Sequence, residues 1–333
     1  CGSHRRPRVG PARARGRGRA RGVEAGGVLG QHRDGVPELA RIVVGFPPGG
    51  TADVLGRALA ERLRGNYAAS VIVENKPGAR GSVAIQAVNA ADADGDVIYI
   101  APHSIVTLYP HVYRKLPFNP VTDMLPAGTL ASFEFALSVS PSLPVRSLAE
   151  FVQWVKANPR SAAYGSLGNG TTAHFLGYML SSAAGGLDLN HIPYKGAGPG
   201  VQDLLAGQIP SLIGPVGDIA QHHRAGKARV LATSGPKRSR FLPDVPTFEE
   251  GGYKGLLATE RFGIFLKRGT APAVVERVNR AVNAALAQDD FRAILEKVSY
   301  EPLATSAQEF EAILKSEHAR WGGIVKASGF SED

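Results

Sequence analysis

The sequence predicts an α/β protein made of two parallel-sheet units that enclose a ligand cleft. Short apolar runs rich in β-branched residues alternate with helical patterns, and the alternation restarts near the middle of the 333-residue chain. Glycine and proline, at 40 and 23 residues, supply the many short turns that this order needs. Hydrophobic residues make up 44% of the chain, enough for a large buried core. The single cysteine excludes a disulfide framework and a cysteine-based zinc site.

The first unit alternates strands and helices. It opens with an apolar run that the turn at residues 47–50 ends, and Thr51 is expected to cap the helix that follows. The predicted elements are a strand at 41–46, a helix at 52–63, a strand at 70–74, a helix at 82–91 and a strand at 97–101. This order implies parallel strands with helices on both faces.

The second unit repeats this plan from residue 147 onward. Its predicted helices lie at 147–157, 171–183, 200–206 and 218–225, and its predicted strands at 162–166, 189–193, 209–213 and 229–233. A strand at 258–266 leads back to the first unit. It is followed by helices at 271–287, 290–297 and 306–327 and a short strand at 300–303. We expect one lobe from residues 37–140 and 260–333, and a second lobe from residues 141–259.

Positive charge is concentrated in an arm at the start of the chain. Residues 1–40 hold nine arginines against three acidic residues, whereas the remainder carries 29 basic and 26 acidic side chains. Residues 1–36 are predicted to be a disordered Arg/Gly-rich arm, because they offer little apolar surface to bury. The arm is interpreted as an engineered or mistranslated leader, with a phosphate-binding tail as the alternative. No aromatic residues interleave with the arginines, so no nucleic-acid partner is expected.

Two strand-to-helix junctions have the composition of an anion site. They are residues 46–53 and 164–174, and both place glycines and hydroxyl residues at the start of a helix. Glycine lets the backbone approach a ligand closely, and free N–H groups at a helix start, with about half a positive charge, favour an anion. The two junctions, one per unit, are predicted to grip a carboxylate from both sides. The alternative is that the glycines only form tight turns.

Two further turns end strands on the same edge of the predicted sheets. They contain His103 and Ser104 in the first unit, and Tyr194 and Lys195 in the second. Ligands of open parallel sheets bind beyond the carboxyl ends of the strands, so these residues are candidates for the cleft lining. His103 and Lys195 can equally be structural or solvated.

Competing motifs give weaker matches. Gly168, Gly170 and Ala173 fit a dinucleotide fingerprint, but Asp188 precedes the next strand and Tyr194 follows it, where an acid is required. A nucleotide-dependent oxidoreductase that uses the 168–173 loop is therefore the alternative function. The sequence contains no phosphate loop, HExxH motif or G-x-S-x-G elbow. We accordingly expect no enzyme activity, no cofactor and no metal site.

The whole body of the chain resembles the Bug family, the TctC-like extracytoplasmic solute-binding receptors of tripartite tricarboxylate transporters. The resemblance covers residues 37–329. The segments that carry it are 42–53 (IVVGFPPGGTAD), 73–79 (VENKPGA), 168–174 (GNGTTAH), 193–196 (PYKG), 225–232 (AGKARVLA), 242–247 (LPDVPT), 269–272 (GTAP) and 321–322 (WG).

The resemblance implies a two-lobed, periplasmic-binding-protein-like fold of type II, which closes around a small carboxylate by a hinge motion. The expected solute is a di- or tricarboxylate, an acidic amino acid or an aromatic acid. A monomeric periplasmic receptor that delivers it to membrane permease subunits is expected. The candidate ligand-binding residues are Phe46, Gly50, Thr51, Asp53, His103, Ser104, Ser166, Gly168, Thr171, Thr172, His174, Tyr194, Lys195 and Arg261.

Two segments depart from the family pattern. Arg261 lies in the crossover segment at 260–263, where many members carry a tryptophan, and either binds a second carboxylate in the cleft or is an exposed strand residue. The turn at 214–217 replaces a more polar turn, which is expected to change the far end of the pocket. The identity of the carboxylate stays open at this point.

Overall fold

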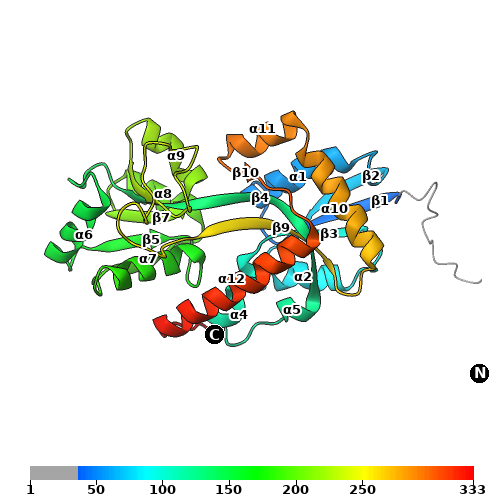
Figure 1. The fold of residues 1–333 in the computed structure, drawn as a ribbon, viewed down its shortest axis with the longest axis horizontal. Coiled ribbons are helices and arrows are strands. Elements are labelled where there is room, and N and C mark those ends of the chain that lie inside the picture. The colour runs from blue at the N-terminus through cyan, green and yellow to red at the C-terminus, as the bar shows by residue number, and fades with distance from the viewer. Residues whose placement is uncertain (1–36) are drawn as a thin grey trace, which may run out of the picture. The chain divides into compact units, whose positions relative to one another are not determined.

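The computed structural model describes residues 37–333. The predicted arm at residues 1–36 lies outside the described residues. Within the described part, ten strands join in one sheet with the order β2-β1-β3-β9-β4-β7-β5-β6, and β8 and β10 also pair with β4. Two parallel groups of strands are therefore connected through β9 and β4, and the predicted α/β class is confirmed (Figure 1).

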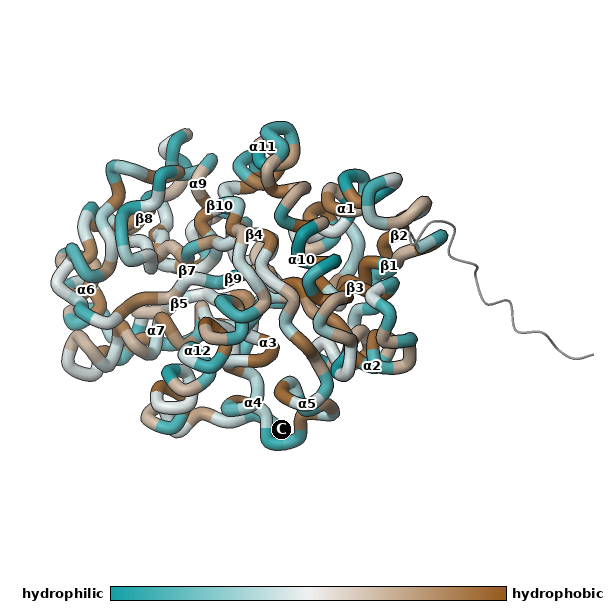
Figure 2. The backbone as a smooth tube through the Cα atoms, turned by 45° about the vertical axis from the view of Figure 1, so that its right-hand side comes forward, coloured by the Kyte–Doolittle hydropathy of each residue, from teal (hydrophilic) through white to brown (hydrophobic). Residues whose placement is uncertain are grey.

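The first parallel group is β2-β1-β3. Strand β1 (Leu39–Val44) pairs in parallel with β2 (Ser70–Asn75) on one side and β3 (Val97–Pro102) on the other. Alternate residues of β1 face opposite sides, so Ile42 and Val44 pack with α1 (Thr51–Leu63), whereas Val43 packs with α2 (Ser82–Asn89). Apolar residues in succession are required because helices cover both faces. Figure 2 shows this run as a brown, hydrophobic stretch of the backbone.

The second parallel group is β6-β5-β7. Strand β5 (Ala163–Ser166) pairs in parallel with β6 (Asn190–Pro193) and β7 (Ser211–Pro215). The helices α7 (Thr172–Ala183) and α8 (Ala197–Leu205) follow β5 and β6 in the chain. The remaining elements of this part are α6 (Leu148–Ala157), α9 (Val216–Arg224) and β8 (Arg229–Thr233).

Two long antiparallel strands connect these groups. Strand β4 (Met124–Val139) pairs with β9 (Thr259–Lys267) over most of its length and then with β7 and β8 (Figure 1). Strand β9 was predicted from the sequence, whereas β4 was not. Pro126 and Gly128 interrupt the strand pattern of β4, and the register with β9 shifts there, which hides a strand from periodicity.

The C-terminal segment covers the first group. It comprises α10 (Pro272–Leu286), α11 (Asp289–Lys297), β10 (Glu301–Pro302) and α12 (Ala307–Ser328). Helix α12 begins with a capping box, in which Ser306 accepts a hydrogen bond from the Glu309 N–H and the Glu309 carboxylate accepts one from the Ser306 N–H. Three short helices that the sequence did not predict lie between β3 and β4: α3 (Ser104–Thr107), α4 (Tyr109–Val112) and α5 (Pro120–Asp123). A single helical turn, η1 (Ala79–Gly81), lies between β2 and α2, where a turn was predicted.

Most predicted elements are found within three residues of their predicted limits. One detail is corrected: Gly50, and not Thr51, occupies the N-cap of α1, and no side chain caps that helix. Thr51 is instead the first helical residue. Among residues 37–333, no helix has both the length and the apolar character of a membrane span.

Candidate functional site

A cavity of about 710 Å³ lies where the parallel strands of both groups end. The segments that follow β1, β3, β5, β6 and β7 all contribute to its lining, together with β4, β9 and Tyr300. This is the position at which open α/β sheets bind ligands, and the volume is typical of a small-molecule site.

The first loop, residues 46–52, is held in shape by Asp53. The Asp53 carboxylate accepts hydrogen bonds from the Arg57 side chain at 3.0 Å, the Gly49 N–H at 2.9 Å and the Asn75 amide at 2.9 Å. The hydrogen bond from Arg57, with those from Gly49 and Asn75, lowers the pKa of Asp53 to about 2 against the effect of burial. Asp53 does not line the cavity; it fixes the loop that does.

Backbone N–H groups at the start of α1 face this cavity. Gly50, Thr51 and Ala52 all line it, and no acceptor within residues 37–333 takes up their N–H groups. Helix starts leave these donors unsatisfied by geometry, and the helix dipole adds positive potential at the same place. The three groups therefore suit an anion.

The second loop, residues 167–173, presents an equivalent set of donors. Thr171 caps α7: its hydroxyl accepts a hydrogen bond from the His174 N–H at 3.3 Å and donates one to the Gly168 carbonyl at 2.9 Å. Gly168 has a φ of 142°, so the chain turns sharply before the helix. Thr171, Thr172 and Ala173 line the cavity, and in the described chain nothing accepts from their N–H groups.

Glu260 on β9 connects the two sides of the cavity. One carboxylate oxygen lies 2.5 Å from His103 Nδ1 and accepts the Ser104 N–H at 3.0 Å, and the other accepts the Thr172 hydroxyl at 3.0 Å. Burial raises the pKa of Glu260, but the charge of His103 and these hydrogen bonds outweigh it, so the net pKa is lowered. The carboxylate is thus ionised and fully engaged by protein groups.

Two stacked histidines support the loop that precedes α7 without lining the cavity. The rings of His174 and His191 stack with centroids 4.0 Å apart, and neither lines the cavity. His174 Nδ1 accepts the Gly170 N–H at 3.1 Å, and His191 Nε2 lies 2.6 Å from the hydroxyl of the buried Ser166. Burial lowers the pKa of His174 to about 4 and, with the neighbouring His174, that of His191 to about 3. Both rings are neutral at pH 7.

Aromatic rings form much of the cavity wall. Phe133 on β4 stacks on Tyr300 with centroids 4.6 Å apart, and Phe262 on β9 stacks on the same Tyr300 ring at 5.8 Å. Phe46, Tyr109 and Phe135 add further rings. A ligand held by its carboxylate would therefore place the rest of its body against aromatic surface.

Arg261 lies on the face of β9 opposite to Glu260. It lines a separate cavity of about 200 Å³, together with Glu134 and Lys237. Strand residues alternate between faces, so adjacent Glu260 and Arg261 cannot both face the main cavity. Arg261 lines this second cavity and not the main one, and its side chain is partly buried, so its placement matches neither predicted alternative in full.

The structure brings half of the predicted site residues to the main cavity. Those that line it are Phe46, Gly50, Thr51, Ser104, Thr171, Thr172 and Lys195. Those that do not are Asp53, His103, Ser166, Gly168, His174, Tyr194 and Arg261. Among the latter, Tyr194 donates a hydrogen bond to Asp203 at 2.7 Å.

Several lining residues were not predicted from the sequence. Phe133 and Phe135 lie on the unpredicted strand β4, and Tyr300 comes from a distant segment, so no local pattern marked them. Asp218 and Glu260 were carboxylates without a recognisable motif. Asp218 could have been identified from its position in the first turn of a helix that follows a parallel strand. The two predicted loops have the same arrangement.

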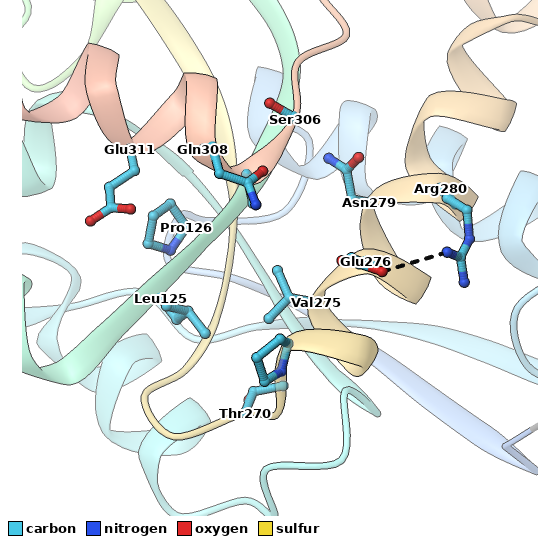
Figure 3. A pocket seen from close by; sticks show the side chains of 12 residues that line it. Leu125, Pro126, Thr270, Val275, Glu276, Asn279, Arg280, Ser306, Gln308 and Glu311 are labelled. Carbon is cyan, nitrogen blue, oxygen red and sulfur yellow. Dashed lines mark ion pairs between the residues drawn. The ribbon is translucent and has the colours of Figure 1, made fainter.

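A third cavity, of about 420 Å³, lies between α10, the start of α12 and β4 (Figure 3). Its charged groups are paired on the surface: Glu276 and Arg280 lie 3.9 Å apart in an exposed ion pair, and Glu311 pairs with Lys315 at 2.8 Å. Asn279 donates to the carbonyls of Ala127 and Thr305. Two helix starts line this cavity, but only that of α12 offers N–H groups, from Ala307 and Gln308, because α10 begins with Pro272. The main cavity has donors on two loops and is therefore the better candidate. Nowhere in residues 37–333 do three His, Cys, Asp or Glu side chains gather as metal ligands would.

Comparisons with known proteins identify the family. A family model described as the tripartite tricarboxylate transporter family receptor, TctC, matches residues 55–330. The protein BugT of Bordetella pertussis is 30% identical over 293 residues, which cover 87% of this chain and 89% of BugT.

Solved structures show the same fold. Rpa4515 of R. palustris, solved with adipate, is 31% identical with a TM-score of 0.79 and covers 88% of this chain and 98% of its own. MatC of Rhodopseudomonas palustris, solved with bound malate, is 25% identical with a TM-score of 0.75 and covers 86% and 98%. The chain therefore has the predicted periplasmic-binding-protein-like α/β fold and belongs to the TctC family of tripartite tricarboxylate transporter receptors, which are solute-binding proteins and not enzymes.

Proposed function

We propose that this protein captures a small carboxylate in the main cavity and delivers it to the membrane subunits of a tripartite tricarboxylate-type transporter. The observation that carries the proposal is the pair of helix starts at the cavity wall, each with three N–H groups that find no acceptor within residues 37–333. Together they supply donors and positive potential for one carboxylate without a charged side chain.

The buried carboxylate of Glu260 is compatible with an anion nearby. One of its oxygens lies 2.5 Å from His103 Nδ1, and its oxygens already accept hydrogen bonds from Ser104 and Thr172. Glu260 therefore orients the α7 loop instead of competing with the ligand for the same donors. Relatives support the class of ligand, since Rpa4515 was solved with adipate and MatC with malate.

Capture is proposed to involve closure of two lobes, residues 37–140 with 260–333 and residues 141–259. Strands β4 and β9 cross between the two parallel groups and are the connection about which such a motion would occur. Because the first loop belongs to one group and the second to the other, closure would bring both sets of N–H groups onto the ligand.

The proposed location is the periplasm, and the proposed partners are the carboxylate and the permease subunits, with the receptor acting as a monomer. Family membership supports the location and the class of partner. The dinucleotide-dependent oxidoreductase that the 168–173 loop suggested is not retained, because the family is one of receptors.

The test is calorimetric titration of the full chain with adipate, malate and a panel of other carboxylates. Thr51→Pro removes one cavity N–H at the first helical position, where proline is tolerated and the preceding Gly50 is already extended, with a ψ of 167°. We expect at least a tenfold loss of affinity. Thr51→Ala is the matched control, because it deletes the hydroxyl and keeps the N–H. Equal affinity in Thr51→Pro and wild type would show that the α1 donors do not hold the ligand.

A further inference from the structure

Three charged side chains line the main cavity, and they differ in what they can offer a ligand. They are Lys195, Asp218 and Glu260. Glu260 is engaged on both oxygens by His103, Ser104 and Thr172. Lys195 is exposed at the start of α8. Asp218 is only partly exposed, and within residues 37–333 no hydrogen bond or ion pair engages its carboxylate.

Asp218 is held in place by the packing of its helix. It is the third residue of α9, which begins immediately after β7. The start of α9 packs closely against the segment before β10: a methyl group on Gly217 would lie 2.3 Å from the Val298 carbonyl oxygen and 3.5 Å from the Tyr300 ring. This packing fixes the backbone that carries Asp218, and its carboxylate lies near enough to Tyr300 to raise the pKa of that phenol. Burial raises the pKa of Asp218 to about 6, so it is mostly ionised at neutral pH.

This arrangement is unfavourable for a second carboxylate on the ligand. Like charges in a partly desolvated cavity repel strongly, because the low local dielectric weakens screening. A cationic nitrogen has the opposite effect, since it would give Asp218 the partner that it lacks. The neighbouring Tyr300 and Phe133 rings stack at 4.6 Å, and aromatic faces also attract cations.

We propose that the ligand is a carboxylate that also carries a positively charged nitrogen, as in an amino acid or a betaine, and that Asp218 selects it over dicarboxylates. The inference rests on the proposed function, in which the loops at α1 and α7 hold the ligand carboxylate. Asp218 would then contact the nitrogen. Lys195, at the exposed rim, would remain available to the carboxylate end.

The experiment compares matched ligands on the full chain by calorimetric titration at pH 7.5. The probes are ω-amino and α-amino carboxylates, their trimethylammonium analogues, and the dicarboxylates and unsubstituted monocarboxylates of the same carbon number. We expect the best amino- or trimethylammonium-carboxylate to bind at least tenfold more tightly than the dicarboxylate of its length. Asp218→Asn, which keeps the shape of the side chain, should reduce that ratio at least tenfold.

Asp188→Asn is the matched control, because Asp188 is exposed and lies outside the cavity. It should leave the ratio unchanged. Tighter binding of dicarboxylates to the wild type, or an unchanged ratio in Asp218→Asn, would overturn the role of Asp218 and leave carboxylate capture standing. If no carboxylate of any class binds the wild type, carboxylate capture itself fails, and the inference fails with it.

Discussion

The Nδ1 atom of His103 lies 2.5 Å from Oε1 of Glu260, and both side chains are buried. His103 follows β3, and Glu260 lies on β9, which pairs with β3 in the antiparallel direction. Through its second oxygen, Glu260 also accepts a hydrogen bond from Thr172 at the start of α7. One buried carboxylate thus fixes the end of a strand in the first group and a loop in the second.

Replacement of His103 by alanine should destabilise the protein severely. It leaves the buried charge of Glu260 uncompensated, which costs about 3–5 kcal/mol in comparable cases. The measurement is urea unfolding at pH 7. The double variant His103→Gln, Glu260→Gln removes the buried carboxylate together with its partner and should recover much of that loss. If the double variant is as unstable as His103→Ala, the charge interaction is not the cause.

Replacement of Thr172 by valine should weaken both folding and ligand binding. Valine has the shape of threonine but cannot donate to Glu260, and leaving a buried acceptor without its partner costs about 1–3 kcal/mol. The start of α7 also loses its tie to β9, so carboxylate affinity should fall in titration calorimetry. Thr172→Ser retains the hydroxyl and should behave as wild type. A Thr172→Val protein with normal affinity would contradict the positioning role.

The His174–His191 stack should make the protein sensitive to acid. Both pKa values are lowered from 6.5, to about 4 and about 3, so in this range the unfolded chain binds protons that the folded protein does not. The free energy of unfolding should therefore fall as the pH drops from 6.5 toward 4. Urea midpoints measured across this range should show a smaller slope in His191→Gln. An unchanged slope would mean that these rings are not the acid-sensitive groups.

Glu134 should contribute a pH dependence of opposite sign. Burial and the nearby Glu301 raise its pKa from 4.5 to about 7, although Lys237 and Ser239 act in the other direction. Between these values the folded state binds the extra proton, so stability from this group is present at low pH and falls as the pH rises. Glu134→Gln should remove that fall, as measured by thermal unfolding at pH 5 and pH 8. Glu276→Gln, on the exposed surface of α10, is the control.

Asp218→Asn should stabilise the ligand-free protein at pH 7.5. Burial raises the pKa of Asp218 from 3.8 to about 6, so its ionised form is held at a cost. The gain should be on the order of 1 kcal/mol, because one pKa unit corresponds to about 1.4 kcal/mol and partial exposure reduces it. Urea unfolding without ligand measures this change. A destabilised variant would show that Asp218 makes a favourable structural contact.

Much of the fold could be predicted from local sequence. Apolar runs such as residues 41–46 must be buried on both faces, which indicates parallel strands. The glycine-rich turns that follow these runs indicate helix starts. The family, the receptor class and the fold are confirmed. Strand β4 was missed because its proline and glycine break the local pattern, and only its pairing with the distant β9 makes it a strand.

The site could be predicted only where the groups that bind the ligand lie within one local loop. The donors of α1 and α7 follow from glycine and threonine at a helix start. The role of His103 did not, because its partner Glu260 is distant in sequence. Asp53 acts through Gly49 and Arg57, four residues away on either side, and through the more distant Asn75. The aromatic wall likewise depends on how β4 and Tyr300 are brought together in three dimensions.

The position of β9 has a consequence for how the chain folds. Strand β9 pairs with one edge of β3. Met124 at the start of β4 pairs with Lys267 at the end of β9. Everything from β5 to β8 lies between them in the chain. During synthesis, the edge of β3 therefore stays unpaired until the whole second group has emerged. Such an open edge is prone to pair with other chains. Contacts between residues so far apart in sequence also slow folding. The receptor is therefore expected to depend on protection of β3 until synthesis is nearly complete.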